Sequence, residues 1–128
     1  MIHEEICTYE VCKLAKEKGF NVQTFDWFDY TGNYHKGFIP HELHECPRYK
    51  EYYAPTQSLL QRWLREKMGI IVEVFMDDDS NMPLTYNIHQ YKDLNWECVC
   101  HHHGNYYAVT DWELCLEDAL KYALEIVV

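Results

Sequence analysis

The sequence predicts a single α+β domain, in which an antiparallel sheet of three to five strands packs with two or three helices. Two observations predict this class. Residues 56–75 join a capped amphipathic helix through a glycine to an apolar strand. Residues 112–127 form another amphipathic pattern after several short extended segments, so 56–128 has the order helix, two or three strands, helix. A length of 128 residues fits one domain.

The N-terminal part, residues 8–39, is expected to hold a helix and a β-hairpin. The helix is predicted over Thr8–Lys18, because its first residue is a favourable N-cap and Gly19 is favourable just after the last turn. Aromatic residues flank a Thr-Gly-Asn turn within 24–39, a pattern typical of a hairpin. Residues 40–55 contain three prolines and no clean period, which predicts an irregular loop.

The third part, residues 56–128, is expected to carry the core. Thr56 is a favourable N-cap for a helix over Thr56–Met68, and Gly69 is expected to end it. Ile70–Phe75 then reads as a strand, followed by an acidic turn. The apolar residues that share one face of this helix are Leu59, Leu60, Trp63, Leu64 and Met68.

Further strands are predicted at Leu84–Tyr91, Trp96–Cys100 and Tyr106–Val109, the last two flanking a turn. The final helix is predicted over Asp111–Val127. Its start has the pattern of a capping box, in which a Thr hydroxyl and a Glu carboxylate three residues later bond to backbone N–H groups. The residues expected on its buried face are Trp112, Leu116, Ala119, Leu120, Ala123 and Val127, with Leu114, Ile126 and Val128 broadening it.

The net charge of −10 opposes binding to phosphate backbones and to anionic membranes. The charge favours a role in solubility, and the alternatives are an acidic face for a basic partner or mimicry of nucleic acid. The N-terminal residues lack the basic and apolar regions of a signal peptide, and no apolar run approaches the ~20 residues that span a bilayer. The six cysteines are therefore expected to be reduced thiols in a cytoplasm.

One cluster has the residue types of a zinc site. Thiolates and imidazoles are ligands that suit Zn²⁺, and Cys98, Cys100, His101 and His103 lie within six positions. The spacing is not that of a structural zinc motif, so exposed turn histidines are the favoured interpretation and no cofactor is expected. The acidic run 77–81 lacks the glycine and distal glutamate of a calcium loop and is expected to be a solvated turn.

Catalytic motifs are weak throughout. The two serines, Ser58 and Ser80, lie outside any G-x-S-x-G context, and the five glycines form no phosphate-binding loop. Cys46 precedes a proline in the expected loop and reads as a thiol without a partner base. An enzyme is therefore the third choice of function.

A basic patch runs against the overall charge. Five of the eleven Lys and Arg residues fall within 48–67, interleaved with tyrosines. The patch is either the polar face of a helix and its loop or a contact for nucleic acid or an acidic partner. The candidate partner-binding residues are Arg48, Lys50, Tyr52, Tyr53, Arg62 and Arg65.

Three segments carry a family resemblance, namely 9–20, 54–67 and 116–124. On these the chain resembles a family of small uncharacterised proteins encoded mainly in bacteriophages and prophages of gut bacteria. The resemblance implies a setting in the cytoplasm of a host bacterial cell and no catalytic residues. The element order over 56–128 also resembles the double-stranded-RNA-binding fold, but the start of the last helix is acidic where that fold uses basic residues.

The leading hypothesis is therefore a non-enzymatic phage or prophage protein-interaction module whose partner is another protein or a second copy of the chain. The alternative is a nucleic-acid-associated or antitoxin-like regulator that uses Arg62 and Arg65. A small enzyme or metal-binding protein comes third, and no membrane partner is expected.

Overall fold

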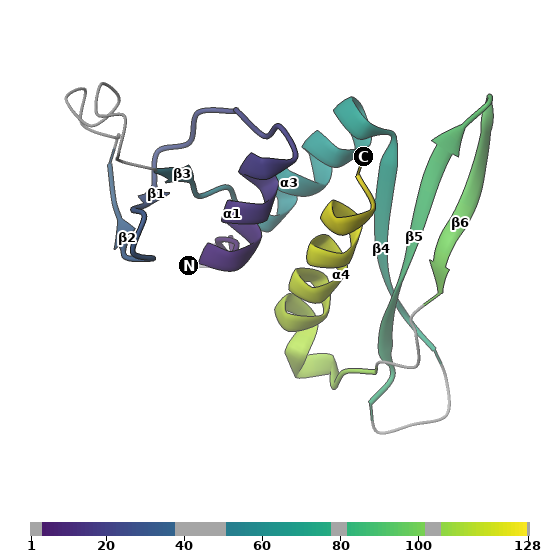
Figure 1. The fold of residues 1–128 in the computed structure, drawn as a ribbon. Helices are drawn as coiled ribbons and strands as arrows, with labels where there is room; N and C mark the ends of the chain where they lie inside the picture. Colours follow the sequence, from purple (N-terminus) through teal and green to yellow (C-terminus); the bar gives the residue numbers. More distant parts are fainter. Residues whose placement is uncertain (1–3, 38–50, 78–81, 102–105, 128) are drawn as a thin grey trace.

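A computed structural model of the chain describes residues 4–37, 51–77, 82–101 and 106–127. It confirms the α+β class, with antiparallel strands and a helix that follows them (Figure 1). The strands within the described residues form two separate sheets of three, one in each half of the chain. The first helix of the chain contacts the first sheet, whereas the last helix contacts the second sheet.

The N-terminal half begins with α1, Tyr9–Glu17, which Thr8 caps by accepting a hydrogen bond from the backbone N–H of Val11. Gly19 has φ +102°, a value that suits glycine because it has no side chain, and it lets the chain turn back over the helix. The predicted helix and its stop are confirmed.

A small sheet follows with the strand order β2-β1-β3. The predicted hairpin is confirmed as β1, Trp27–Phe28, paired with β2, Tyr34–His35. The third strand, β3, Tyr52–Tyr53, lies in the segment expected to be an irregular loop. Its aromatic side chains are favourable in strands, which explains why this stretch pairs despite the nearby prolines.

The second helical unit is α3, Gln57–Trp63, continued by a π-helical turn over Leu64–Met68. Thr56 caps it by accepting a hydrogen bond of 3.1 Å from the Leu59 N–H, and Gly69 ends it in the left-handed conformation. The predicted span 56–68 is confirmed, but the sequence did not predict its π-helical last turn. The spacing of apolar residues does not distinguish such a turn from the rest of an α-helix.

The second sheet has the order β4-β5-β6, with β4 at Ile70–Met76, β5 at Leu84–Lys92 and β6 at Asn95–His101. All neighbours are antiparallel. The strand predicted over Tyr106–Val109 is wrong: only one bridge pairs Tyr107 with Leu84, and a 3₁₀ turn starts at Val109. Because the chain turns into the next helix directly after Tyr107, too few extended residues remain to pair along a strand.

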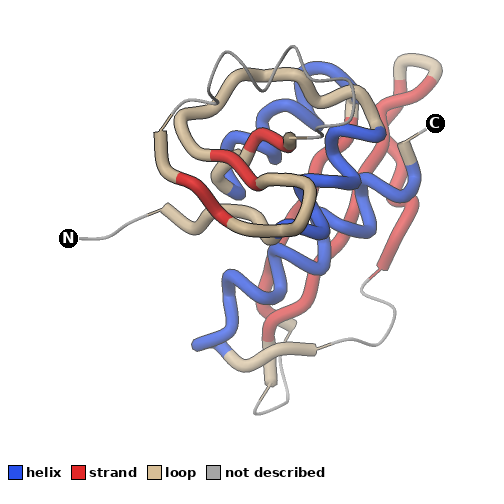
Figure 2. Tube along the Cα trace, turned by 60° about the vertical axis from the view of Figure 1, so that its left-hand side comes forward, coloured by secondary structure: helices blue, strands red, loops and turns tan. Residues whose placement is uncertain are grey.

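The last helix, α4, spans Trp112–Ile126. It lies between the second sheet and the helices α1 and α3, as Figures 1 and 2 show from two directions. The predicted capping box is wrong, because Thr110 lies inside the 3₁₀ turn and the N-cap Asp111 makes no side-chain cap. Trp112 and Leu114, expected in the core, are 45% and 53% exposed. Trp112 is the first residue of α4, and Leu114 lies two positions before the buried Leu116, on the other side of the helix.

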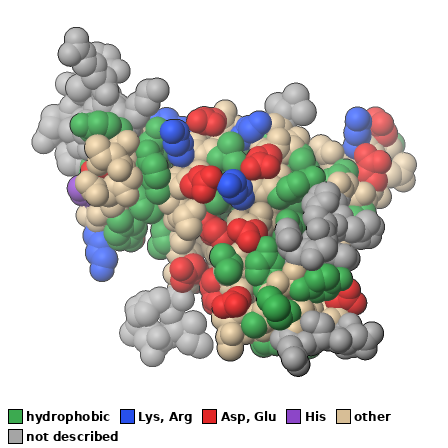
Figure 3. Space-filling view, turned by 60° about the horizontal axis from the view of Figure 1, so that its bottom comes forward, with side chains coloured by type: hydrophobic (Ala, Val, Ile, Leu, Met, Phe, Trp, Pro, Cys, Tyr) green, Lys and Arg blue, Asp and Glu red, His purple; other side chains and the backbone are tan. Residues whose placement is uncertain are grey.

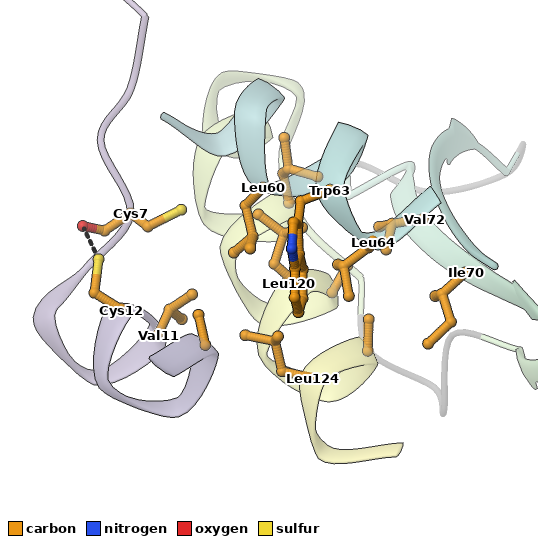
Figure 4. Close-up of a cluster of buried hydrophobic side chains, with 14 of the residues drawn as sticks. Cys7, Val11, Cys12, Leu60, Trp63, Leu64, Ile70, Val72, Leu120 and Leu124 are labelled. Atoms are coloured by element: carbon orange, nitrogen blue, oxygen red, sulfur yellow. Dashed lines mark hydrogen bonds between the residues drawn. The ribbon is translucent and has the colours of Figure 1, made fainter. Parts of the chain in front are cut away.

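One apolar cluster joins the three helices to the second sheet (Figure 4). Leu120 of α4 and Leu60 and Leu64 of the α3 unit are fully buried. The ring of Phe20 meets that of Trp63 edge to face, with centroids 5.3 Å apart. Packing of this kind explains why helices with modest intrinsic propensity hold their positions. No helix among the described residues has the length and apolar content needed to cross a membrane.

Replacing Leu120 by Ala should lower the free energy of unfolding by about 2–5 kcal/mol, because it leaves a cavity in this cluster. The matched control is Leu114→Ala on the same helix, where the side chain is more than half exposed and the change should stay within about 0.5 kcal/mol. Urea unfolding of both variants measures the two values. Equal losses would show that α4 does not bury the face described here.

Candidate functional site

A buried carboxylate joins the three helices at one end of the molecule. Glu117 of α4 accepts a hydrogen bond of 2.7 Å from the backbone N–H of Thr8, at the start of α1. Its other oxygen accepts one of 2.9 Å from the side-chain amide of Gln57, at the start of α3. The same amide also donates to the backbone carbonyl of Glu113 at 2.9 Å. The starts of all three helices therefore meet around this group.

Two short extended segments reinforce this junction. Residues 5–7 lie antiparallel to residues 55–57, with an N–H of Cys7 donating to the carbonyl of Pro55 and that of Gln57 donating to Glu5, both at 2.9 Å. The segment that leads into α1 is thus held against the segment that leads into α3. Residues of both segments line hollows on the surface of this junction.

Three adjoining hollows run across this junction, and together they are called here the helix-start groove. The first, of about 480 Å³, is lined by Arg62, Arg65 and Leu59 and ends at Glu4. The second, of about 270 Å³, shares Glu4 with the first and extends to Trp112. The third, of about 210 Å³, shares Glu5, Gln57 and Glu113 with the second and reaches Ile6, Leu114 and Glu117.

The groove has a charge difference between its two ends. Arg62 and Arg65 lie at the first hollow, whereas the described residues that line the other two include carboxylates and no Lys, Arg or His. Arg62 is paired with Glu66 at 3.0 Å, across one helical turn. Figure 3 shows acidic and hydrophobic side chains interleaved over the end of the molecule where α4 begins. The hollows are open and shallow, so they suit side chains of a polypeptide better than an enclosed small molecule.

The structure places only part of the predicted partner surface in this groove. Arg62 and Arg65 are exposed and line it. Arg48 and Lys50 lie outside the described residues. Tyr52 was expected on the surface, and this is wrong: it is 6% exposed and meets the ring of Tyr9 edge to face at 5.6 Å.

Tyr53 is only partly exposed and belongs to the small sheet, where it pairs with Trp27. Both tyrosines thus form the strand β3, which was not predicted because the surrounding sequence is rich in proline. Lys16 lies over the ring of Tyr52, with its Nζ 5.3 Å from the ring centroid. Tyr52 therefore serves the packing of α1 rather than an exposed contact.

The structure describes the side chain of only one residue of the zinc candidate, Cys98. Cys98 is exposed on β6 and pairs across the ladder with His89, while residue 100 pairs with Ile88. A bulge at Val99 therefore interrupts the regular ladder between β5 and β6. No three His, Cys, Asp or Glu side chains among the described residues gather as a metal site, and the side chains of Cys100, His101 and His103 lie outside the described part.

The buried thiols are poor nucleophiles. Burial raises the pKa of Cys7 and of Cys12 far above the ordinary value, and the nearby Glu117 carboxylate adds to both shifts. Burial, together with Asp118, raises the pKa of Cys115 to about 11. All three remain protonated near neutral pH, which suits small core residues.

Asp29 is the most strongly perturbed carboxylate described, and its surroundings are those of a turn. It accepts hydrogen bonds from the Thr31 hydroxyl at 2.5 Å, from His35 at 2.8 Å and from two backbone N–H groups. These bonds hold the pKa of Asp29 far below its usual range. Its acceptor sites are thus occupied by the hairpin that it stabilises.

Sequence reasoning missed the residues that organise the groove. Glu117 occupies the buried side of α4, one turn before Leu120 and near Leu124, and a charged residue at such a position is a signal of a buried partner. Gln57 sits in the first turn of α3 and is 5% exposed. Comparison of the chain with protein-family models, with curated proteins and with solved structures gave no match.

Protein purified in reducing buffer without added metal should contain less than one zinc per chain. The reason is that the spacing of these cysteines and histidines is not that of a structural zinc motif. Elemental analysis of the purified protein measures this. Stoichiometric zinc, with a large fall in melting temperature in a chelator, would instead establish a structural metal site.

Proposed function

We propose that this protein is a non-enzymatic interaction module that binds another protein through the helix-start groove. The observation that supports it most is an exposed tryptophan beside carboxylates in a continuous hollow. Trp112 is 45% exposed at the rim although it begins a helix whose other apolar residues are mostly buried. Tryptophan is enriched among residues that contribute most to protein interfaces.

The charge of the groove favours a protein over nucleic acid. The rim between Glu4 and Glu113 is acidic, and the whole chain carries −10. Phosphates approaching Trp112 would meet these carboxylates and be repelled. A polypeptide can bring basic and apolar side chains to the same place, so it fits this surface better.

A second candidate function is a nucleic-acid-associated or antitoxin-like regulator. The observation in its favour is that Arg62 and Arg65 are both exposed at one end of the groove. However, a double-stranded-RNA-binding-like use of the fold would need basic residues at the start of α4, and that turn carries Asp111 and Glu113. We therefore rank this function second, and we propose the cytoplasm of a phage-carrying bacterium as the setting of either.

Site-specific photocrosslinking tests the two functions together. A photoreactive amino acid replaces Trp112 in the groove, and in a control protein it replaces Leu94, which is 85% exposed on the distant β5–β6 turn. Cells from which the gene comes are irradiated while they produce each variant. We expect a discrete protein adduct from position 112 and none of that mass from position 94.

A nucleic-acid adduct at position 112 would favour the regulator instead. Equal adducts from both positions, or no discrete adduct from position 112, would contradict the proposal. Adding Glu113→Lys to the position 112 variant should weaken the adduct, because it reverses a charge at the rim without disturbing the buried cluster.

A further inference from the structure

We infer that the helix-start groove binds an extended segment of a partner protein that places a basic side chain next to an apolar one. The basic group would lie between Glu5 and Glu113, and the apolar group against Trp112 and Leu114. This inference rests on the proposed function and adds the chemistry of the partner.

The carboxylates of the groove differ in what they already bind. Glu117 is 9% exposed and accepts bonds from Thr8 and Gln57, and Glu4 accepts one of 3.0 Å from the Ser58 hydroxyl. Glu5 and Glu113 are exposed, and within the described part of the chain only their backbone carbonyls accept hydrogen bonds. Their carboxylates are therefore available to accept a cation from outside.

Hydrogen bonds from Gln57 hold the backbone at both Glu5 and Glu113. The Glu5 carbonyl accepts from the N–H of Gln57, and the Glu113 carbonyl accepts from the Gln57 side chain, both at 2.9 Å. One residue thus holds the backbone of both acidic positions at the lining of the same hollow. An incoming cation would meet two carboxylates whose backbone is already fixed, so less backbone has to be ordered on binding.

The apolar part of the ligand follows from the same wall. Trp112 is 45% exposed at the second hollow, and Leu114, which is 53% exposed, lines the adjoining third hollow with the partly exposed Ile6. Large apolar side chains grouped at a hollow with a polar rim are typical of an interaction site. A partner segment that carried charge alone would leave this wall in water.

The two arginines at the far end of the groove predict the order of charged residues along the partner segment. Arg65 is exposed there, next to Arg62, at the hollow that adjoins the acidic pair through Glu4. A segment long enough to cover all three hollows would meet carboxylates first and guanidinium groups last. We therefore expect its basic residues at one end, and an acidic residue is favoured at the other.

Selection from a displayed library of random peptides tests this inference. The wild-type protein is compared with Glu5→Gln/Glu113→Gln and with the control Glu73→Gln/Glu97→Gln, which removes two exposed carboxylates of the second sheet. We expect peptides selected on wild type to carry Lys or Arg beside an apolar residue. Their affinity should fall about tenfold on the groove variant and stay unchanged on the control.

A charge exchange makes the test reciprocal. Glu5→Lys/Glu113→Lys should reject the selected peptides and bind versions in which Glu replaces their basic residues. Peptides that lose binding in Trp112→Ala but show no basic preference would overturn the inferred chemistry and leave the proposed function in place. Absence of any groove-dependent peptide would also overturn this inference, and crosslinking at position 112 would then decide the function separately.

Discussion

The Glu117 carboxylate is the contact on which the arrangement of the helices depends. Removing a charge from water is costly, and it is tolerated only where hydrogen bonds satisfy both oxygens. Here one oxygen accepts from the backbone N–H of Thr8, the N-cap of α1, and the other accepts from the side-chain amide of Gln57, the first residue of α3. The N-terminus of α1 also favours a negative charge, because the helix dipole is positive at that end.

This contact joins parts of the chain that are far apart in sequence. Thr8 and Glu117 are separated by 109 positions, and Gln57 and Glu117 by 60. Burial of apolar side chains around Leu120 brings α4 close to α1 and α3, but the hydrophobic effect that drives it is non-directional. The hydrogen bonds select one alignment of the three helix starts. They also place Glu5, Glu113 and Trp112 around one hollow, so the groove is a consequence of the same junction.

The local signals of the sequence predicted local structure well. Thr8 and Thr56 cap their helices and Gly69 ends one, since each choice depends on a few neighbouring residues. The Thr110 capping pattern failed because the chain first makes a 3₁₀ turn to reach α4 from the bridge at Tyr107. Division into two sheets was not predictable, because it depends on which distant strands pair.

The site was less predictable than the fold. Arg62 and Arg65 were found because they lie on the polar face of a recognisable helix. Tyr52 was misplaced because its strand partner, Phe28, lies 24 positions earlier and no local pattern announces the pair. The acidic half of the groove is assembled from three separate segments, and only their packing brings Glu5, Gln57 and Glu113 together.

A double-mutant cycle between Gln57 and Glu117 tests this account most directly. The free energies of unfolding are measured for the wild type, Gln57→Ala, Glu117→Ala and the double variant. Because the two side chains share a buried, charge-assisted hydrogen bond of 2.9 Å, we predict a coupling energy of about 1–3 kcal/mol. Additive losses, with a coupling energy near zero, would contradict the claim that this carboxylate holds the helix starts together.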